Sequence, residues 1–376
     1  MRLMYVLVAD LLVISYFYHK QDTQQYNQAM KIAVITDQHL DGRKGSLAFW
    51  NYWHKFYNEI FFPTLEREGI TTVFDLGDTF DNRKSMDFNT LNRIKTDYFD
   101  RLRKYDVHMI LGNHTTYYKN TSRINSPELL LEEYDNITIY KDVTEISKGN
   151  TKFLMLPWIN ADNKEQSMKA IEESDASIVC GHLEMNGFEV TPGMTFDHGG
   201  LEIPVFKDYD RVWSGHFHHR STRGNIQYLG NPYQMFWNDY KDRRGFHIYD
   251  TEEDKLEFIE NPFEIFQKVY YNDVENDYTN FNTDYCKDSF VKVIVEEKRS
   301  YTKFEDFVDK LYRTGVHDVK IVETLVDTEA VDDVELDVKD TLTLLSEYID
   351  EIDLSVDKTD LKKLMQSLYI ESCEVV

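Results

Sequence analysis

Short apolar runs alternate with longer amphipathic segments from Met30 onward, which is the pattern of a layered α/β domain. The amphipathic segments predict helices over Phe49–Glu68 and Asn89–Lys104. We expect these elements to build one domain over residues 30–262. The apolar runs predict strands over Lys31–Thr36, Thr71–Leu76, His108–Leu111, Phe153–Leu156, Ser177–Cys180, Arg211–Trp213, Ile226–Leu229, Gly245–Tyr249 and Leu256–Ile259.

A different pattern follows Asn261. Ser289–Glu296 alternates as a strand, Lys303–Tyr312 has the spacing of a helix, and Val319–Glu323 alternates as a second strand. These three elements predict a small α/β domain, which we place at residues 263–326.

The end of the chain is acidic. From Val319 to Val376 there are sixteen Asp and Glu against five Lys, and residues 327–340 have the composition of a flexible acidic linker. Residues 341–376 then offer two short amphipathic helices. We expect their apolar faces to dock onto a helix of another protein, with packing back onto the body as the alternative.

The first 29 residues differ from the rest. Leu3–Tyr18 is an apolar run of sixteen residues that contains Asp10 and is shorter than the roughly 20 residues of a membrane span. No small-residue cleavage site of a signal peptide follows it. We expect residues 1–29 to be a leader or alternative-start extension outside the fold, with Met30 as the rival start, and we predict no membrane association.

Composition narrows the function classes. Of 376 residues 41% are hydrophobic, which excludes disorder throughout the chain. The three cysteines, Cys180, Cys286 and Cys373, are far apart, which argues against a disulfide framework or a zinc ribbon and favours a reducing cytoplasm. Because the net charge is −25, any contact with nucleic acid must come from local basic groups.

Candidate chemistry lies where the predicted strands stop. Carboxyl ends of strands in an open α/β sheet meet in one crevice, so the side chains that follow five of these strands are expected to converge. Imidazoles mixed with carboxylates and one amide suit borderline divalent ions such as manganese, iron or zinc. Such a site predicts two-metal phosphoester hydrolysis, with a metal-bound hydroxide as nucleophile. The five segments are Asp37-Gln38-His39, Gly77-Asp78, Gly112-Asn113-His114, Gly181-His182 and Gly215-His216-Phe217-His218.

This ordered set, DQH…GD…GNH…GH…GHFH, resembles the calcineurin-like metallophosphoesterases, and within them the SbcD-type double-strand-break repair nucleases, most closely those of T-even-type phages. The resemblance runs from Met30 to the end of the chain. It implies a β-sandwich flanked by helices, a capping domain and two divalent ions, for which we expect Mn2+. It implies one ion on Asp37, His39, Asp78 and His218, a second on Asp78, Asn113, His182 and His216, and His114 as the acid that protonates the leaving group.

Two neighbouring carboxylates and one substitution bear on this assignment. Asp75 and Asp81 flank Asp78, but Asp75 is expected to face into its strand and Asp81 lacks a preceding glycine. The family's GNH is usually followed by Asp, whereas Thr115 stands here. This change bears on the hydrogen bonds around Asn113 and His114, which tune activity in metal sites.

Basic residues near the motifs are candidates for DNA contact. We expect Arg83, Lys84, Lys119 and Arg123 to position phosphates, because each lies within ten residues of an expected ligand. Tyr117 and Tyr118 are candidates for stacking on unpaired bases, with a place in the core as the alternative. The weaker basic candidates are Arg43, Lys44, Arg220, Arg223, Arg243 and Arg244.

Together with the resemblance, these observations predict a divalent-metal-dependent DNA endo/exonuclease that acts in recombination, repair and replication. By resemblance, it would be a dimeric nuclease subunit that binds an SbcC or Rad-fifty-type ATPase through residues 341–376 in the cytoplasm, or in the host cytoplasm if it is phage-encoded. Two alternatives stay open. One is a phosphomonoesterase or small-molecule phosphodiesterase, and the other is a scaffold that organises DNA ends without cleaving them.

Overall fold

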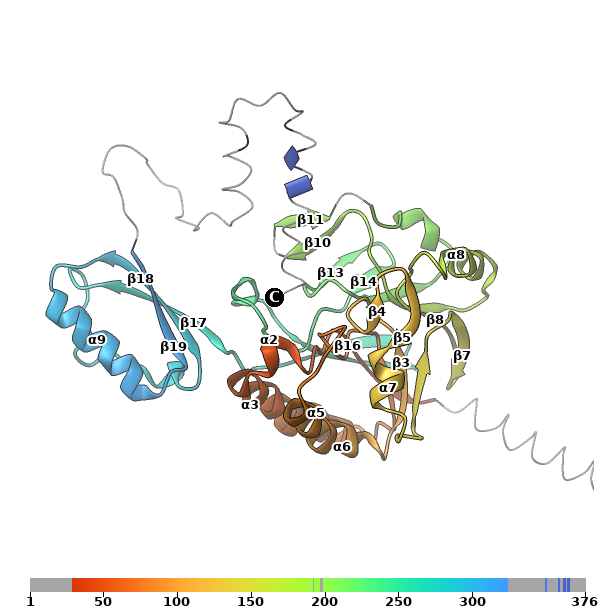
Figure 1. Cartoon of the computed structure of the whole chain (residues 1–376), viewed down its shortest axis with the longest axis horizontal. Helices are drawn as coiled ribbons and strands as arrows, with labels where there is room; N and C mark the ends of the chain where they lie inside the picture. The colour runs from red at the N-terminus through yellow and green to blue at the C-terminus, as the bar shows by residue number, and fades with distance from the viewer. Residues whose placement is uncertain are drawn as a thin grey trace, which may run out of the picture. The chain divides into compact units, whose positions relative to one another are not determined.

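Two six-stranded sheets form the body of the protein in a computed structural model (Figure 1). The structure describes residues 29–191, 193–196 and 199–323 and the single positions 349, 358, 361, 362, 364 and 365. The strand order of the first sheet is β16-β15-β1-β2-β3-β6, and that of the second is β13-β14-β12-β9-β8-β7. The first comprises β1 (Lys31–Ile35), β2 (Thr72–Asp75), β3 (Asp106–Ile110), β6 (Ile137–Tyr140), β15 (Gly245–Asp250) and β16 (Lys255–Glu260). The second comprises β7 (Thr144–Lys148), β8 (Thr151–Leu156), β9 (Ile178–His182), β12 (Arg211–Gly215), β13 (Ser221–Arg223) and β14 (Ile226–Tyr228).

The sheets pack face to face. Alternate side chains of β1 belong to two different buried clusters, which shows this packing. On β1, Ile32 and Val34 belong to a buried cluster with Phe153 and Trp213 of the second sheet. The alternate residue Ala33 belongs to a different cluster, which contains the aromatic side chains of the helices. Because successive side chains of a strand point to opposite faces, one face of the first sheet meets the second sheet and the other meets the helices. The expected sandwich flanked by helices is confirmed.

Helices cover the outer face of the first sheet. The predicted helix over residues 49–68 is one continuous helical stretch that contains a π-helical turn, and the stretch predicted over residues 89–104 contains a second. Tyr57 in the first π turn donates a 2.6 Å hydrogen bond to the Oε1 atom of Gln38, next to the motif residue Asp37. The segments are α2 (Gly42–Gly45), α3 (Leu47–Phe56), η1 (Tyr57–Phe61), α4 (Phe62–Arg67), α5 (Phe88–Ile94), η2 (Lys95–Phe99) and α6 (Asp100–Leu102).

Parallel pairing brings the strand ends together. Strands β1, β2 and β3 run parallel to one another, as do β8, β9, β12 and β14. The carboxyl ends of each group therefore lie at one edge of their sheet, and the motif residues follow these ends.

Residues 266–323 form a small three-stranded sheet with one helix. The sheet has the order β17-β18-β19, made of Phe266–Asn272, Phe290–Glu297 and Asp318–Glu323, and α9 (Tyr301–Thr314) packs on one face (Figure 1). Strand β17 was not predicted. Two aromatic residues of this unit, Phe266 and Phe290, lie against Phe49 of the body, with ring centroids 6.0 and 5.3 Å apart.

Several short elements were also missed by the sequence patterns, besides β6, β7 and β13. They are β4 (Thr116–Tyr118), β5 (Thr121–Asn125), β10 (Phe188–Thr191), β11 (Met194–Phe196), α7 (Ser126–Leu130), α8 (Lys164–Glu173), η3 (Ile203–Phe206), η4 (Trp237–Asp239) and η5 (Asp284–Cys286).

Three predictions fall on segments that the structure leaves largely undescribed. Residues 1–28 of the predicted leader and the whole of the predicted linker, 327–340, lie outside the described residues. The chain divides after Val322 into two compact units. Within the third predicted segment, residues 341–376, the positions that the structure describes are helical. Within the described part of the chain, no helix has the length and apolar character needed to cross a membrane.

Candidate metal centre

Eight predicted site residues gather at the carboxyl ends of five strands. Asp37 and His39 follow β1, Asp78 follows β2, and Asn113 and His114 follow β3. From the second sheet, His182 is the last residue of β9, and His216 and His218 follow β12. All of these side chains are buried or half-buried. Ligand atoms of Asp37, His39 and His218 lie within 4.8 Å of one another, as do those of Asp37, Asp78 and His182.

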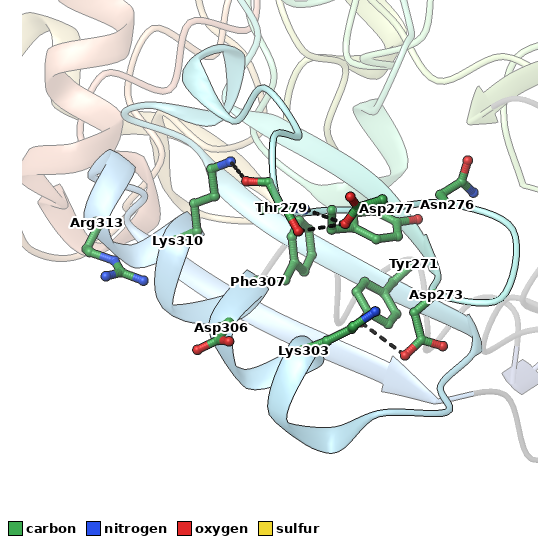
Figure 2. Close-up of a pocket in the computed structure, with 11 residues that line it drawn as sticks. Tyr271, Asp273, Asn276, Asp277, Thr279, Lys303, Asp306, Phe307, Lys310 and Arg313 are labelled. Atoms are coloured by element: carbon green, nitrogen blue, oxygen red, sulfur yellow. Dashed lines mark hydrogen bonds between the residues drawn. The ribbon is translucent and has the colours of Figure 1, made fainter.

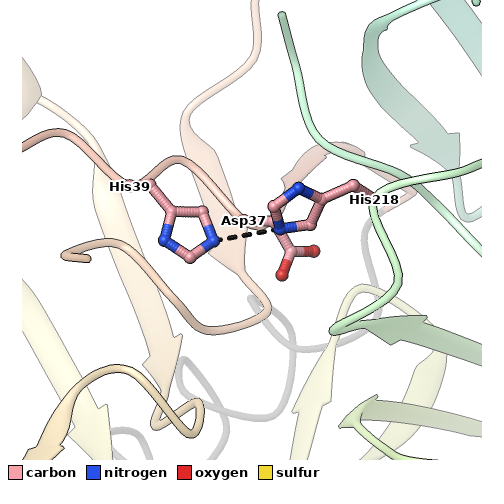
Figure 3. A group of neighbouring side chains, drawn as sticks. All are labelled: Asp37, His39 and His218. Atoms are coloured by element: carbon pink, nitrogen blue, oxygen red, sulfur yellow. Dashed lines mark hydrogen bonds between the residues drawn. The ribbon is translucent and has the colours of Figure 1, made fainter. Parts of the chain in front are cut away.

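The first half of the centre is built on two imidazoles. The Nε2 atoms of His39 and His218 face each other at 3.1 Å, with the carboxylate of Asp37 beside them (Figure 3). Ligand atoms on adjacent corners of an octahedron with metal–ligand bonds of about 2.1 Å lie about 3 Å apart. The distance between the two nitrogens therefore fits two ligands of a single ion.

The second half has the same spacing. The Oδ1 atom of Asn113 lies 3.0 Å from Nε2 of His182 and 3.0 Å from Nδ1 of His216. The Oδ2 atom of Asp78 lies 3.1 Å from Nε2 of His182 and 4.0 Å from Nε2 of His39. Asp78 therefore stands between the two halves, which is the position of a bridging carboxylate in a two-metal site.

Hydrogen bonds from the far side of the ring orient two of the histidines. The Nδ1 atom of His182 donates to the carbonyl oxygen of Leu76 at 2.8 Å, which leaves the Nε2 lone pair directed into the centre. The Nδ1 atom of His114 donates to the carbonyl oxygen of Asp81 at 2.8 Å, so its Nε2 atom is likewise left for the site. The backbone N–H of His114 donates to Oδ1 of Asp78 at 2.8 Å.

Four of the expected ligands have strained backbone. The φ angles of Asp37, His39, Asp78 and His216 are 51°, 44°, 52° and 88°, in the left-handed region that side chains with a Cβ atom rarely occupy. Such conformations cost about 1–3 kcal/mol each and cluster at functional sites. The fold therefore holds these side chains in place at a cost to its stability.

Two glycines allow the strand ends to approach the carboxylates. A Cβ atom on Gly112 would lie 2.1 Å from Oδ1 of Asp78. One on Gly215 would lie 2.0 Å from Oγ1 of Thr36 and 2.9 Å from Oδ2 of Asp37. Glycine at these positions is therefore a steric requirement of the centre.

The buried acids and imidazoles shift one another's pKa values. Burial raises the pKa of Asp37. Burial also acts to raise the pKa of Asp78, but attraction to His182 and His114 outweighs it and holds this pKa well below its usual range. Burial lowers the pKa of His216 to about 3, which keeps this imidazole neutral and able to bind a cation.

Asp81, which the sequence analysis discounted as a rival of Asp78, lies beside two of the site histidines. Its Oδ1 atom lies 3.0 Å from Nδ1 of His39 and 3.4 Å from Nδ1 of His114. Its loop is held by Asp41, whose carboxylate accepts from the backbone N–H groups of Asp81, at 2.6 Å, and Asn82. The second acid of the segment GDTFD is the sequence signal for this contact.

Asp75 lies as expected, away from the centre. It accepts hydrogen bonds from Nε2 of Gln38 at 2.8 Å, Oγ1 of Thr79 at 2.7 Å and the backbone N–H of Gly77. Burial raises its pKa to about 7. Asp75 therefore ties together the loops after β1 and β2.

Thr115 closes the turn that presents Asn113. Its Oγ1 atom accepts from the backbone N–H of Gly112 at 3.0 Å and donates to the carbonyl oxygen of Gly112 at 2.9 Å. The hydroxyl thus fixes the turn in the place of the acid usual in the resembled family.

Arg244, suggested above as a weak candidate for DNA contact, is buried instead. It is 4% exposed and donates to Asp239 Oδ1 at 2.8 Å and to Asp242 Oδ2 at 2.7 Å. It also donates to Asn231 and to the backbone carbonyl of His218. Arg244 therefore supports the His218 loop and is wrong as a surface contact.

The four stronger DNA candidates lie in segments that follow the site residues along the chain. Arg83 and Lys84 follow Asp81, and Lys119 and Arg123 lie on the hairpin of β4 and β5 that follows His114. Arg83 is half-buried, and the other three are exposed. Tyr117 and Tyr118, on the same hairpin, are also exposed, so neither is a core residue.

Comparison with known proteins identifies the family of this chain. The family model of calcineurin-like phosphoesterases matches residues 30–220. The chain therefore belongs to the calcineurin-like phosphoesterases, enzymes that act with divalent metals. Within known proteins it is similar to exonuclease subunit 1 of Enterobacteria phage T4, with 33% identity over 323 residues, 82% of this chain and 90% of that protein.

Three solved structures are similar to part of this chain at low sequence identity. An archaeal phosphodiesterase is 16% identical (62% of this chain, 100% of that chain, TM-score 0.31), and nuclease MPE of Pseudomonas putida is 13% identical (61% and 87%, TM-score 0.30). Purple acid phosphatase PPD1 of yellow lupin is 14% identical (52% and 38%, TM-score 0.32). At these TM-scores the three structures carry no information about substrate.

Proposed function

We propose that this protein is a two-metal DNA endo/exonuclease that processes DNA ends in recombination, repair and replication. The observation that carries the proposal is the pair of ligand sets that share Asp78. DNA as the substrate is supported by the 33% identity to a phage exonuclease subunit over 82% of the chain.

In this proposal one divalent ion is held by Asp37, His39, Asp78 and His218. The other ligands, Asn113, His182 and His216, hold the second ion together with Asp78. When bound, the ions supply a hydroxide at neutral pH and stabilise the charge of the transition state. The mixed nitrogen and oxygen donors support Mn2+ as the natural ion.

His114 is the proposed acid for the leaving oxygen. Its Nδ1–H donates to the carbonyl oxygen of Asp81, so the ring presents Nε2 to the substrate. Asp78 and Asp81 outweigh the effect of burial and raise the pKa of His114 to about 9, which favours the protonated form required of an acid. Arg83, Lys84, Lys119 and Arg123 then position the DNA phosphates.

The proposed assembly is a homodimer bound to an SbcC or Rad-fifty-type ATPase through residues 341–376, working in the cytoplasm, or in a host's cytoplasm if phage-encoded. A partner subunit is supported by the similarity to a phage protein that is itself named as a subunit of an exonuclease.

A cleavage assay tests this function. Linear duplex and circular single-stranded DNA are incubated with the full chain and Mn2+, and compared with the variants Asp78→Ala and His114→Ala. His54→Ala is the matched control, because His54 is a partly exposed residue of α3 outside the expected ligand set. We expect loss of cleavage of at least a hundredfold in both site variants and none in the control.

Two other results would replace the proposal. Turnover of a phosphomonoester while both DNA substrates stay intact would assign the chain to small-molecule chemistry. Intact DNA and an intact phosphomonoester, even with the partner ATPase present, would favour the non-catalytic scaffold.

A further inference from the structure

Trp158 lies against two expected ligands of the second ion. The centroid of its indole ring is 5.1 Å from that of the His216 imidazole and 6.3 Å from that of the His182 imidazole. His182 is fully buried, whereas Trp158 and His216 are half-buried. Where this half of the centre reaches solvent, it is therefore bordered by an aromatic side chain.

The backbone holds Trp158 at this place. It is the second residue after β8, which runs parallel to β9, so it follows the same edge of the sheet as His182. Its backbone N–H donates to the carbonyl oxygen of Leu111 at 2.8 Å, two residues before the expected ligand Asn113. Its carbonyl oxygen accepts from Nδ2 of Asn163 at 3.0 Å. The segment that carries the indole is thus tied to the ends of strands from both sheets.

The chemistry of an indole limits what it can recognise. Trp158 carries no charge and a single N–H donor, so it contributes little to binding a phosphate, which cations contact better. Its flat ring matches the face of a nucleic-acid base, and every base has such a face. A base inside a duplex is stacked between its neighbours and has to leave the stack before an enzyme can contact its face. An indole beside the two ions therefore favours a substrate whose base is unpaired at the bond that is cut.

Two further exposed rings lie on the hairpin that follows His114. Tyr117 and Tyr118 of β4 are 38% and 50% exposed, and their ring centroids are 4.7 Å apart. The hairpin contacts the segment after Trp158, because Nδ2 of Asn160 donates to Oγ of Ser122 at 2.9 Å. The two segments that carry these aromatic side chains are thus in direct contact beside the centre.

We propose that Trp158 stacks on an unpaired base next to the phosphodiester that is hydrolysed, and that this contact gives the enzyme a preference for single-stranded DNA and frayed ends. The inference rests on the proposed nuclease function. It adds a contact to a base, whereas the four basic side chains proposed above contact phosphates. Tyr117 and Tyr118 offer faces for bases further along the same strand.

A second aromatic group provides a contrast. Tyr271 and Phe307 line a pocket of the β17-β18-β19 unit, among acidic and basic side chains (Figure 2). Their ring centroids are 5.3 Å apart, and Tyr271 also stacks on Tyr278 at 4.5 Å, so these rings cover one another's faces. Tyr312, on the same helix as Phe307, is 51% exposed. Because this helix carries no expected ligand, Tyr312→Leu is the control for loss of an exposed ring.

The test compares two 30-nucleotide single strands, each labelled with fluorescein and incubated with Mn2+ and the full chain. One strand is oligothymidine, and the other has the same phosphates but a tetrahydrofuran group in place of every nucleoside, so it has no bases. The values of kcat and KM are measured for the wild type, Trp158→Leu, Trp158→Phe and Tyr312→Leu. The Mn2+-induced rise in Tm reports the expected ligands separately.

We expect Trp158→Leu to lose about tenfold in kcat/KM on oligothymidine, because stacking of one base on one aromatic side chain contributes a factor of this size. On the strand without bases the loss should shrink to less than threefold. Trp158→Phe should keep most of the activity on oligothymidine, since a phenyl ring also stacks. Tyr312→Leu should stay within twofold of the wild type on both strands, and all four proteins should show the same rise in Tm.

The preference for unpaired bases is measured with the same variants. Oligothymidine is paired with oligodeoxyadenosine, and cleavage of the duplex is compared with cleavage of the single strand. We expect the ratio of single-strand to duplex cleavage to fall in Trp158→Leu and to stay unchanged in Tyr312→Leu.

Two results would overturn the inference and leave the nuclease proposal standing. In the first, Trp158→Leu cleaves oligothymidine as fast as the wild type does. In the second, it loses the same factor on both strands, which would make Trp158 a support for His216 without a contact to a base. A wild type that cleaves neither strand but hydrolyses a phosphomonoester would overturn the nuclease proposal itself, and this inference with it.

Discussion

The Nε2 atoms of His39 and His218 lie 3.1 Å apart, each on a ring that enters the centre from a different sheet. A nitrogen that donates to its neighbour cannot also bind a cation, so a shared ion and a direct hydrogen bond are alternatives for this pair. Burial lowers the pKa of His218 well below its usual value, which keeps its lone pair available. The spacing of the pair thus fits two ligands of one ion.

Mn2+ should stabilise the fold through these two rings. A hundredfold excess of ligand over Kd stabilises a folded protein by about 2.7 kcal/mol. We expect His39→Ala and His218→Ala to lose at least half of the Mn2+-induced rise in Tm, and the surface variant His54→Ala to keep all of it. Thermal unfolding with Mn2+ and with EDTA measures this. An unchanged rise in His39→Ala would remove that residue from the ligand set.

Thr115 should matter through its hydroxyl. Thr115→Val keeps the shape of the side chain but breaks both hydrogen bonds to Gly112, so the turn that carries Asn113 is released. Changes of this kind around metal ligands reduce affinity or activity about 10- to 100-fold. We expect that loss in Mn2+-dependent diester hydrolysis, and near wild-type activity in Thr115→Ser. Equal activity of the two variants would show that the hydroxyl is dispensable.

Arg244 should be needed for stability as well as for the His218 loop. Arg244→Met leaves Asp239 and Asp242 without their cation, and breaking a buried ion pair in this way costs about 3–5 kcal/mol. Urea unfolding of the two proteins measures the difference. The surface variant Arg243→Met, which breaks an exposed pair with Glu260, should cost at most about 1 kcal/mol. Similar losses for the two variants would contradict the buried role.

The pH dependence of stability should contain a contribution from His247. Burial lowers the pKa of this histidine from 6.5 to about 3, so between these values the unfolded chain binds a proton that the folded chain does not. Its contribution is therefore present above pH 6.5 and is lost as the pH falls towards 3. Between pH 7 and pH 5 the loss is about 2 kcal/mol.

His247→Phe removes this proton. Urea unfolding at pH 7 and pH 5 should show that the variant loses about 2 kcal/mol less than the wild type over this interval. An equal loss in both proteins would mean that His247 is protonated in the folded state.

The sequence was a good guide to residues that follow buried strands. Asp37, Asp78 and His182 could be found because each comes directly after, or ends, an apolar run, and parallel pairing brings such positions to one edge. The face-to-face packing of two sheets was expected from the family resemblance, because the apolar runs alone indicate only a layered α/β domain. That these residues bind metal stays a prediction of the resemblance and of the spacing of their ligand atoms.

Other features depend on contacts that no local pattern encodes. Asp81 reaches His114 through its carbonyl oxygen, and its loop is fixed by the distant Asp41. Next to Arg243 in the sequence, Arg244 looks like a residue of a basic surface pair. Hydrogen bonds to two carboxylates and a backbone carbonyl allow it to be buried instead. Strand β17 reads FQKVYYN, in which two adjacent tyrosines hide the alternation. In each case tertiary partners decide the outcome.

The central claim is that two ions share Asp78. Crystals soaked in Mn2+ and measured at the manganese absorption edge should show two anomalous peaks about 3.5–4 Å apart, one beside His39 and His218 and the other beside Asn113 and His182, with Asp78 contacting both. A single peak, or peaks away from these side chains, would contradict the account.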